Sequence, residues 1–344
     1  MAGNRLNTAL RPLLMLLVGL LILGAIYWNI DLLELVEVFA QSDTVWLGAA
    51  LIIFIPTTLG TAWRLRVLVP PPASIRLGEA TRLTLVAASL NIVLPSKMGD
   101  IAKGVFIARR GHLPTAMALS LTIYEKTCDI LALLAWCVVG LMLIPSRGPL
   151  ITTVAVLVLG GLLFGILALM TPLADLLLRR IALLLPVGKL ARGLDGLADA
   201  WARVRVANSR RPGGALAVGI MSIGIWLLHL LQIWMFIRAL GSSVPLADSL
   251  GLTPLAILVG LLPLTMAGIG TRDAALIYFY AGYFGAATGA ALGLLCTLRY
   301  VIPGVAGLPW LRTGWALRAE AAAVSPAPQG STDTGDSFES RIRW

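Results

Sequence analysis

The sequence predicts an all-α polytopic membrane protein of about six spanning helices plus two re-entrant helical hairpins, oppositely oriented and forming an inverted repeat. Three observations support this fold class. Of the 344 residues, 58% are hydrophobic and 13% are charged, and the mean hydropathy of +0.89 is too high for a soluble fold. Long apolar runs alternate with arginine-rich loops. Two shorter apolar runs are each interrupted by Pro and Gly.

The first apolar run, 12–28, follows Arg5 and Arg11 and has the pattern of a secretory signal without a clear small-residue cleavage site. We therefore expect an uncleaved signal anchor. Four acidic residues and no basic residue follow it: Asp31, Glu34, Glu37 and Asp43. By the positive-inside rule this loop is external and the N-terminus is cytoplasmic.

The second span, 45–62, leads into Arg64 and Arg66, which predict a cytoplasmic loop. The apolar run 83–94 that follows would be about 18 Å long as a helix, against a hydrocarbon core of about 30 Å. It is too short to cross. A hairpin that turns at 95–99 and returns to the cytoplasm satisfies both the length and the charge rule.

The next two spans are 113–144, running outward, and 150–170, running inward. Segment 171–211 then carries eight basic residues against three acidic ones. This excess predicts a cytoplasmic segment that lies in part as an amphipathic helix on the anionic leaflet.

The last third of the chain repeats the order of the earlier part. Span 215–240 runs outward, and a second short apolar run enters from outside, turns at 263–271 and returns by Gly282. Span 286–305 crosses inward and places the C-terminus in the cytoplasm. The tail 319–344, rich in Ser, Pro, Gly and charge, is predicted to be disordered.

The two interrupted runs share an order of residues. The matching steps are Leu94-Pro95 followed by Gly99-Asp100, and Leu262-Pro263 followed by Gly270, Arg272 and Asp273. The predicted repeat halves are 45–144 and 215–305, within one transmembrane domain, 1–318. Short Gly/Pro-interrupted segments at matching positions indicate a midplane binding site of a transporter. The alternative is two kinked spanning helices in an ordinary bundle.

Each returning helix begins near the bilayer midplane, where its free N–H groups and dipole favour an anion. Ser96 and Thr271 stand at the expected N-caps, with Asp100 and Asp273 in the first turns. Five cations lie in or near these elements: Lys97, Lys103, Lys126, Arg272 and Arg299. They slightly outnumber the carboxylates Asp100, Glu125, Asp129 and Asp273, as suits a cavity for a phosphate-bearing headgroup.

Glu125 and Asp129 lie four residues apart on one helix face, where they can pair with the hairpin lysines or with Arg272. A buried carboxylate needs such a partner. The alternative interpretation is that these charges are structural ion pairs that only hold the hairpins to the bundle. His229 is expected to be a satisfied polar group inside the bundle.

Four motifs together resemble one family. They are N-x-x-L-P-S-K-M-G-D-x-x-K from Asn91, Y-E-K-x-x-D from Tyr124, G-I-G-T-R-D from Gly268, and Arg299. Across about 45–311 they are similar to the lysylphosphatidylglycerol synthase transmembrane (flippase) family. The resemblance implies a bacterial or archaeal protein of the cytoplasmic membrane that handles an amphiphilic lipid and moves it between leaflets.

The residues expected to bind or translocate the lipid are Asn91, Ser96, Lys97, Asp100, Lys103, Glu125, Lys126, Asp129, Gly268, Gly270, Thr271, Arg272, Asp273 and Arg299. The family more often has Glu at Asp100 and Asp273, and Arg at Lys103 and Lys126. These exchanges keep the charge but alter the reach and the fork geometry. The headgroup therefore stays open among aminoacyl-phospholipid, glycolipid, polyprenyl-linked and hopanoid lipids.

Three functions remain open. The first is a lipid flippase without the soluble transferase domain that lysyl-lipid synthesis needs in this family. The second is an intramembrane lipid-linked transferase, against which the chain has no G-x-S-x-G or H-E-x-x-H motif. The third is a non-catalytic accessory that holds a glycosyltransferase or lipid-synthesis enzyme at the membrane through 171–211.

Other classes of site are not expected. The net charge of +10 comes from arginines in loops beside apolar runs, so we expect no nucleic-acid partner. Cys128, Cys137 and Cys296 lie in apolar segments without metal-ligand spacing and are expected to be buried small hydrophobes. We therefore expect neither a metal nor a cofactor. The oligomeric state stays open, with a homodimer among the alternatives.

Overall fold

The computed structural model describes residues 17–26, 28, 30–69, 74–93, 98–110, 113–143, 148–184, 188–210, 214–262, 265 and 268–323. Within these ranges every regular element is an α-helix, which confirms the predicted all-α polytopic class. The re-entrant course of the hairpins and the inverted repeat stay predictions. The hairpin tips at 94–97 and parts of 263–267 lie outside the described residues, as do Ser96 and Lys97.

Five stretches are long and apolar enough to cross a bilayer. They are α3 with α4 (Thr44–Ile52 and Phe54–Leu68), α7 (Thr115–Leu143), α8 (Pro149–Met170), α11 (Gly214–Ala239) and the first part of α14 (Ala286–Ala323). All five were predicted from the sequence. Of the sixth, 12–28, the described part is the short apolar helix Leu17–Ile26 and residue 28, so its span stays a prediction.

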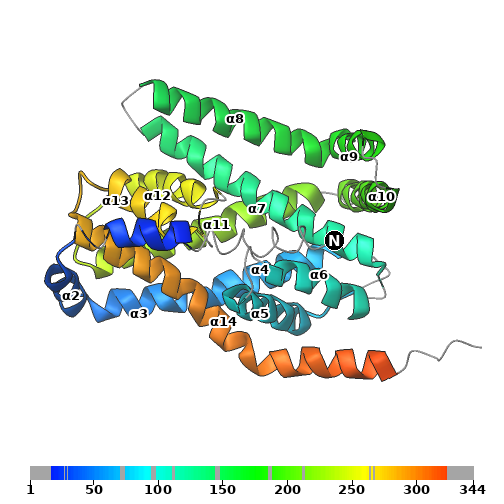
Figure 1. The fold of residues 1–344 in the computed structure, drawn as a ribbon, viewed down its shortest axis with the longest axis horizontal. Helices are drawn as coiled ribbons and strands as arrows, with labels where there is room; N and C mark the ends of the chain where they lie inside the picture. Colours follow the sequence, from blue (N-terminus) through cyan, green and yellow to red (C-terminus); the bar gives the residue numbers. More distant parts are fainter. Residues whose placement is uncertain are drawn as a thin grey trace, which may run out of the picture.

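The long helices run along the length of the molecule in Figure 1, with different short helices at the two ends. α2 (Leu32–Ala40) lies at one end, and α9 (Leu173–Leu184) and α10 (Gly188–Arg210) lie at the other. α14 continues to Ala323, so the start of the segment predicted to be disordered is helical. Which end faces the cytoplasm stays a prediction.

Two pairs of short helices occupy the positions of the predicted hairpins. α5 (Leu77–Val93) packs against α6 (Met98–Arg110), and α12 (Leu246–Gly260) packs against α13 (Thr271–Phe279). The first pair lies toward the α10 end and the second toward the α2 end (Figure 1). α5 begins at Leu77, earlier than the predicted run, because its first turns are polar. At 17 residues it spans about 25 Å, still less than a hydrocarbon core.

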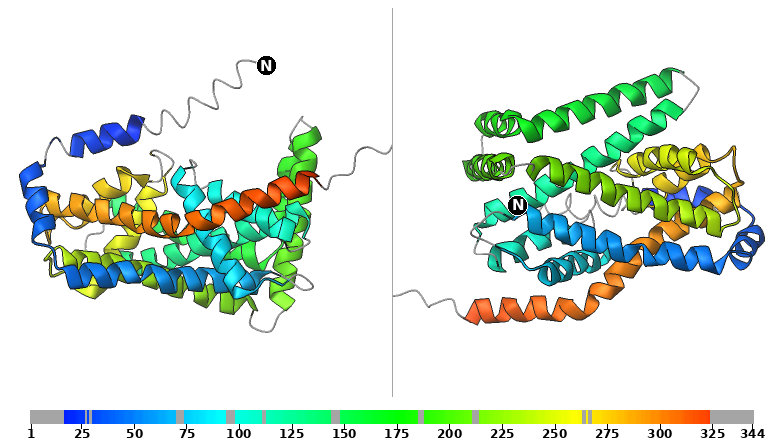
Figure 2. Two further views of the ribbon diagram at one scale, coloured as in Figure 1. Left: turned by 90° about the horizontal axis from the view of Figure 1, so that it is seen from below. Right: turned by 180° about the vertical axis from the view of Figure 1, so that it is seen from behind.

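Glycines allow two pairs of helices to touch backbone to backbone. α14 runs alongside α5 (Figures 1 and 2), and a Cβ at Gly307 would overlap the carbonyl oxygen of Leu85. α7 and α12 meet in the same way, because a Cβ at Gly140 would overlap the carbonyl oxygen of Gly251. Side chains larger than hydrogen cannot occupy these contacts without moving a helix.

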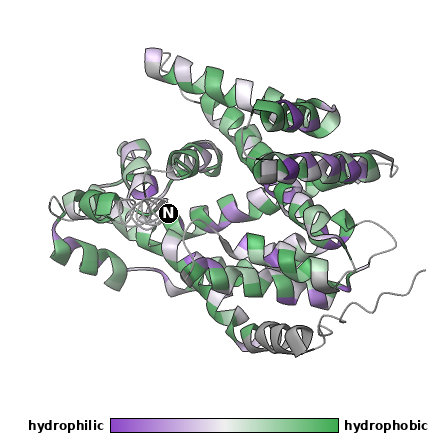
Figure 3. Cartoon of the chain, turned by 45° about the vertical axis from the view of Figure 1, so that its right-hand side comes forward, coloured by the Kyte–Doolittle hydropathy of each residue, from purple (hydrophilic) through white to green (hydrophobic). Residues whose placement is uncertain are grey.

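Segment 171–211 forms the α9–α10 pair and packs in part on the protein. α10 contacts α7, where the rings of Trp201 and Tyr124 lie 5.6 Å apart. Ion pairs join α10 to α9, Arg179 with Asp199 and Arg205 with Asp175. Figure 3 shows hydrophilic residues along α10, whereas the long helices are mostly hydrophobic. Contact of this segment with an anionic leaflet stays a prediction.

The contact between Gly140 and Gly251 gives a test of the packing. Gly140→Ala should destabilise the protein by about 1–3 kcal/mol, because the methyl group forces α7 and α12 apart. The measurement is the melting temperature of the detergent-purified protein. Gly160→Ala on α8 is the matched control, since its Cβ meets nothing within 4 Å. Equal melting temperatures for the two variants would contradict the close approach.

Candidate functional site

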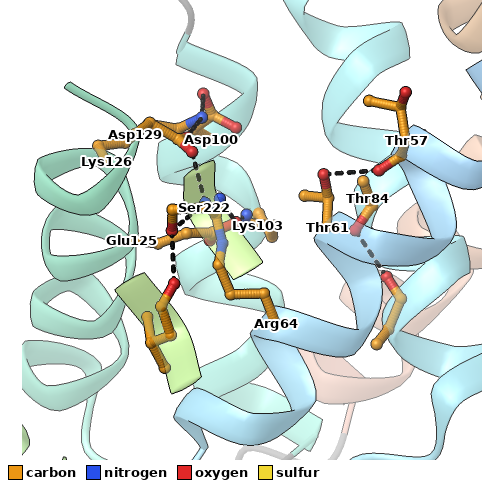
Figure 4. A network of polar contacts seen from close by, with 12 residues as sticks. Thr57, Thr61, Arg64, Thr84, Asp100, Lys103, Glu125, Lys126, Asp129 and Ser222 are labelled. Atoms are coloured by element: carbon orange, nitrogen blue, oxygen red, sulfur yellow. Dashed lines mark hydrogen bonds and ion pairs between the residues drawn. The ribbon is translucent and has the colours of Figure 1, made fainter. Parts of the chain in front are cut away.

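Arg64 lies at the centre of a buried ion-pair network (Figure 4). It is 1% exposed, and its Nη2 lies 3.1 Å from Glu125 Oε1 while its Nη1 lies 2.5 Å from Asp129 Oδ1. Nη1 also donates to Ser222 Oγ on α11 at 2.9 Å. Three helices, α4, α7 and α11, therefore meet at one guanidinium group.

The prediction for Arg64 was wrong. The sequence places it in a cytoplasmic loop after 45–62, but α4 continues to Leu68, so Arg64 stands one turn inside the helix. The positive-inside rule treats any arginine near the end of a span as a flank. The sequence does carry a signal, because Leu65, Val67 and Leu68 continue the apolar run past Arg64.

Lys103 completes the most buried part of the network. Its Nζ lies 2.5 Å from Glu125 Oε2, and the two side chains are 2% and 0% exposed. Both oxygens of Glu125 are thus occupied by cations, Arg64 on α4 and Lys103 on α6. The expected pairing of Glu125 with a hairpin lysine is confirmed. It fixes the helix after the first hairpin tip to the long helix α7.

The other part of the network is more open. Lys126 Nζ lies 3.2 Å from Asp100 Oδ2 and 3.3 Å from Asp129 Oδ2. Lys126 is 41% exposed, against 14% for Asp100 and 19% for Asp129. Within the described residues this network holds three cations and three carboxylates, so it is balanced by itself. One of the three cations is Arg64, which is not among the predicted site residues. The slight positive excess was predicted for both hairpins and Arg299 together and stays a prediction.

Asn91 satisfies a backbone group at the start of α6. Its Oδ1 accepts a hydrogen bond from the Gly99 N–H at 2.9 Å, one of the first-turn N–H groups that have no partner within a helix. The sequence reading gave the capping role to Ser96, which lies outside the described residues. Gly99 is required here, because a Cβ would lie 2.7 Å from Asn91 Oδ1 and overlap the Ala87 carbonyl oxygen.

The second hairpin holds its own ion pair. Arg272 is 4% exposed and offers its Nε and Nη2 to Asp273 Oδ1 at 2.9 and 2.6 Å. Nη2 also donates to Thr297 Oγ1 and to the Gly293 carbonyl on α14, at 2.9 and 3.0 Å. The predicted alternative that Arg272 neutralises Glu125 is therefore wrong. The geometry favours a structural role for this pair, which ties α13 to α14.

The turn before α13 depends on two glycines with positive φ. Gly268 has φ +75° and Gly270 has φ +96°, a region that favours glycine. Gly270 is the N-cap and Thr271 the first helical residue, so the helix begins one residue earlier than the prediction of Thr271 as the N-cap implies. Asp273 Oδ2 accepts from the Gly270 N–H at 3.0 Å, and Thr271 Oγ1 lies 2.9 Å from Thr265 Oγ1. The Asp273 carboxylate thus caps α13 as well as pairing with Arg272.

Arg299 lies apart from both ion-pair networks, between α14 and α11. It is 5% exposed, and its Nη1 lies 3.3 Å from His229 Nδ1. Its Nη2 donates to the Tyr300 hydroxyl at 2.6 Å, and the guanidinium lies 4.6 Å from the centre of the Tyr300 ring. His229 thus has a polar partner inside the bundle, as predicted. All three cysteines are buried, also as predicted.

These features define a polytopic helical membrane protein that carries ionisable side chains on the inner faces of its helices. The chain belongs to the lysylphosphatidylglycerol synthase TM region family, whose profile matches residues 13–307. A comparison with curated proteins found no match. The family match confirms the resemblance drawn from the motifs and associates the chain with lipid synthesis or flipping in a membrane.

The network predicts a large effect of removing Arg64. Arg64→Gln leaves Asp129 without its closest cation and Glu125 with Lys103 alone, so it should cost about 3–5 kcal/mol of stability. Thermal unfolding of the detergent-purified protein measures it. Arg66→Gln is the matched control, because Arg66 is exposed on the same helix. This variant should have the melting temperature of the wild type. An Arg64→Gln variant as stable as the control would show that the pairs contribute nothing.

Proposed function

We propose that the protein binds an amphiphilic lipid and translocates it across the cytoplasmic membrane, with both chain termini in the cytoplasm. The observation that carries the proposal is the graded exposure of the ion-pair network. Lys126 is 41% exposed near the middle of the spanning helix α7, whereas Glu125 beside it is fully buried. Ionisable groups at this depth in a membrane face a polar pathway or a partner and mark sites of function.

The open end of the network has the chemistry to exchange partners with a headgroup. The pair of Lys126 with Asp100 is the less buried part of the network, so it can separate while both oxygens of Glu125 stay paired. Lys126 can then take the phosphate of a headgroup, while Asp100 and Asp129 take an ammonium group. The acyl chains stay in the lipid. The buried pairs of Glu125 with Arg64 and Lys103 keep α4, α6 and α7 together while the pairs of Lys126 separate.

Two further points support transport over catalysis. The family takes its name from the membrane region of lysylphosphatidylglycerol synthase, the non-catalytic part of that enzyme. The network also lies beside the start of α6, where first-turn N–H groups favour an anionic headgroup. Aminoacyl-phospholipid, glycolipid, polyprenyl-linked and hopanoid lipids are the cargo classes to compare.

Translocation can be measured in liposomes that contain the purified protein and a headgroup-labelled lipid of each class. Wild type should move one class. Lys126→Gln should slow that movement at least about tenfold, because one charge-assisted contact to the headgroup is lost, while its melting temperature stays close to that of wild type. Arg272→Gln should lower both quantities, since Arg272 ties α13 to α14.

Arg66→Gln is again the control and should move lipid at the wild-type rate, because Arg66 is outside the network. Movement of no lipid class by the wild type would refute the proposal. Equal translocation rates for Lys126→Gln and Arg66→Gln would show that the ion-pair network does not contact the lipid during translocation, and would contradict the assignment of the site.

A further inference from the structure

Three arginines of the described chain are almost completely buried: Arg64, Arg272 and Arg299, with 1%, 4% and 5% exposure. The first two are compensated by carboxylates, Arg64 by Glu125 and Asp129 and Arg272 by Asp273. In the described ranges no carboxylate lies within ion-pair distance of Arg299. A buried cation without a counter-charge is strongly unfavourable, so a site that keeps one is suited to an anion from outside the chain.

Within the part of the chain that the structure describes, no polar contact of Arg299 is to a carboxylate. Nη1 contacts the His229 imidazole and Nη2 the Tyr300 hydroxyl, while Nε is buried and has no hydrogen-bond partner. Arg64 also leaves its Nε unpaired, but its charge is neutralised by two carboxylates. Arg299 therefore differs from Arg64 in keeping both an unused donor and an uncompensated charge.

In Arg272 a carboxylate occupies the edge of the guanidinium group that Nε and Nη2 form. Its Nε and Nη2 both point to Asp273 Oδ1, at 2.9 and 2.6 Å. On Arg299 the same Nε and Nη2 edge meets only the phenol of Tyr300. This edge matches the spacing of two oxygens of a carboxylate or a phosphate. The phenol thus stands where an oxyanion would bind.

Arg299 also lies between the two ion-pair networks. On α14 it follows Thr297, which belongs to the second hairpin's network. Across from it on α11, His229 stands seven residues after Ser222, which binds Arg64. Seven residues bring both side chains to the same helix face, about 10 Å apart along the axis.

We propose that Arg299 is an anion-binding residue that takes the phosphate of a lipid headgroup on its Nε and Nη2 edge, in place of the Tyr300 hydroxyl. Tyr300 is 43% exposed, and His229 contacts Nη1 from α11. This inference rests on the proposed function and deepens it, because it names the cargo as a phosphate-bearing lipid.

Equilibrium binding to the full-length protein in a neutral detergent tests this. The probes are phosphatidylglycerol and diacylglycerol with the same acyl chains, with inorganic phosphate as the competitor. Wild type should prefer phosphatidylglycerol by at least about tenfold, as expected for charge-assisted hydrogen bonds to one phosphate. Arg299→Gln should abolish the preference. Arg299→Lys should keep part of it, since the charge stays but the fork is lost.

The control is Arg238→Gln, which removes another arginine that lies over an aromatic ring, 5.9 Å from the centre of Trp46, and should bind as wild type does. A second readout separates binding from structure. Arg299→Gln removes an uncompensated buried charge, so its melting temperature should equal or exceed that of wild type, in contrast to Arg64→Gln.

Two results would overturn the inference: an unchanged phosphatidylglycerol preference in Arg299→Gln, or a fall in melting temperature as large as that of Arg64→Gln. Binding of inorganic phosphate to the wild type as tight as that of phosphatidylglycerol would assign the residue to free phosphate and reject the lipid headgroup. The two proposals fail separately. A wild type that prefers phosphatidylglycerol through Arg299 but moves no lipid refutes translocation only. Translocation that depends on Lys126 without an effect of Arg299 on binding refutes the Arg299 site only.

Discussion

The carboxylate of Glu125 is the constraint on which the bundle depends. It is fully buried, and its two oxygens contact Arg64 and Lys103, which come from different helices. In a medium of low dielectric constant an ionised carboxylate cannot be left alone, so α4, α6 and α7 must come together for any of them to be stable there. Ser222 brings α11 to the same point. The position of the first hairpin follows from this charge more than from the shape of the apolar surfaces around it.

The helices could be predicted well from the sequence, because length, hydropathy and arginine bias are local properties. The spacing of Glu125 and Asp129 also indicated the buried ion pairs, and the pairing with Lys103 was found. The centre of the site was missed, because charge bias alone cannot distinguish a buried arginine near a helix end from a flanking one. The partner of Arg272 was missed for a related reason. The sequence shows which charges need neutralising but not which neighbour is within reach, and Asp273 is the adjacent residue.

The two hairpins share a sequence pattern but use their charges differently. In the first, Asp100 and Lys103 reach across to α7, and the pairs become more exposed toward Lys126. In the second, Arg272 and Asp273 pair with each other, and Arg272 donates to the backbone of α14, with little exposure of either side chain. An open network can exchange its partners, whereas a closed one serves as an anchor. The matching positions of the two segments therefore carry different chemistry.

The glycine contacts have a mechanical consequence. The close contacts join the two predicted halves of the repeat. α5 of the first half packs against α14 of the second, and α12 of the second packs against α7 of the first. Each predicted half thus has one short helix packed tightly against a long helix of the other half. Such halves cannot rock apart as two rigid bodies unless backbone contacts without spare volume are broken.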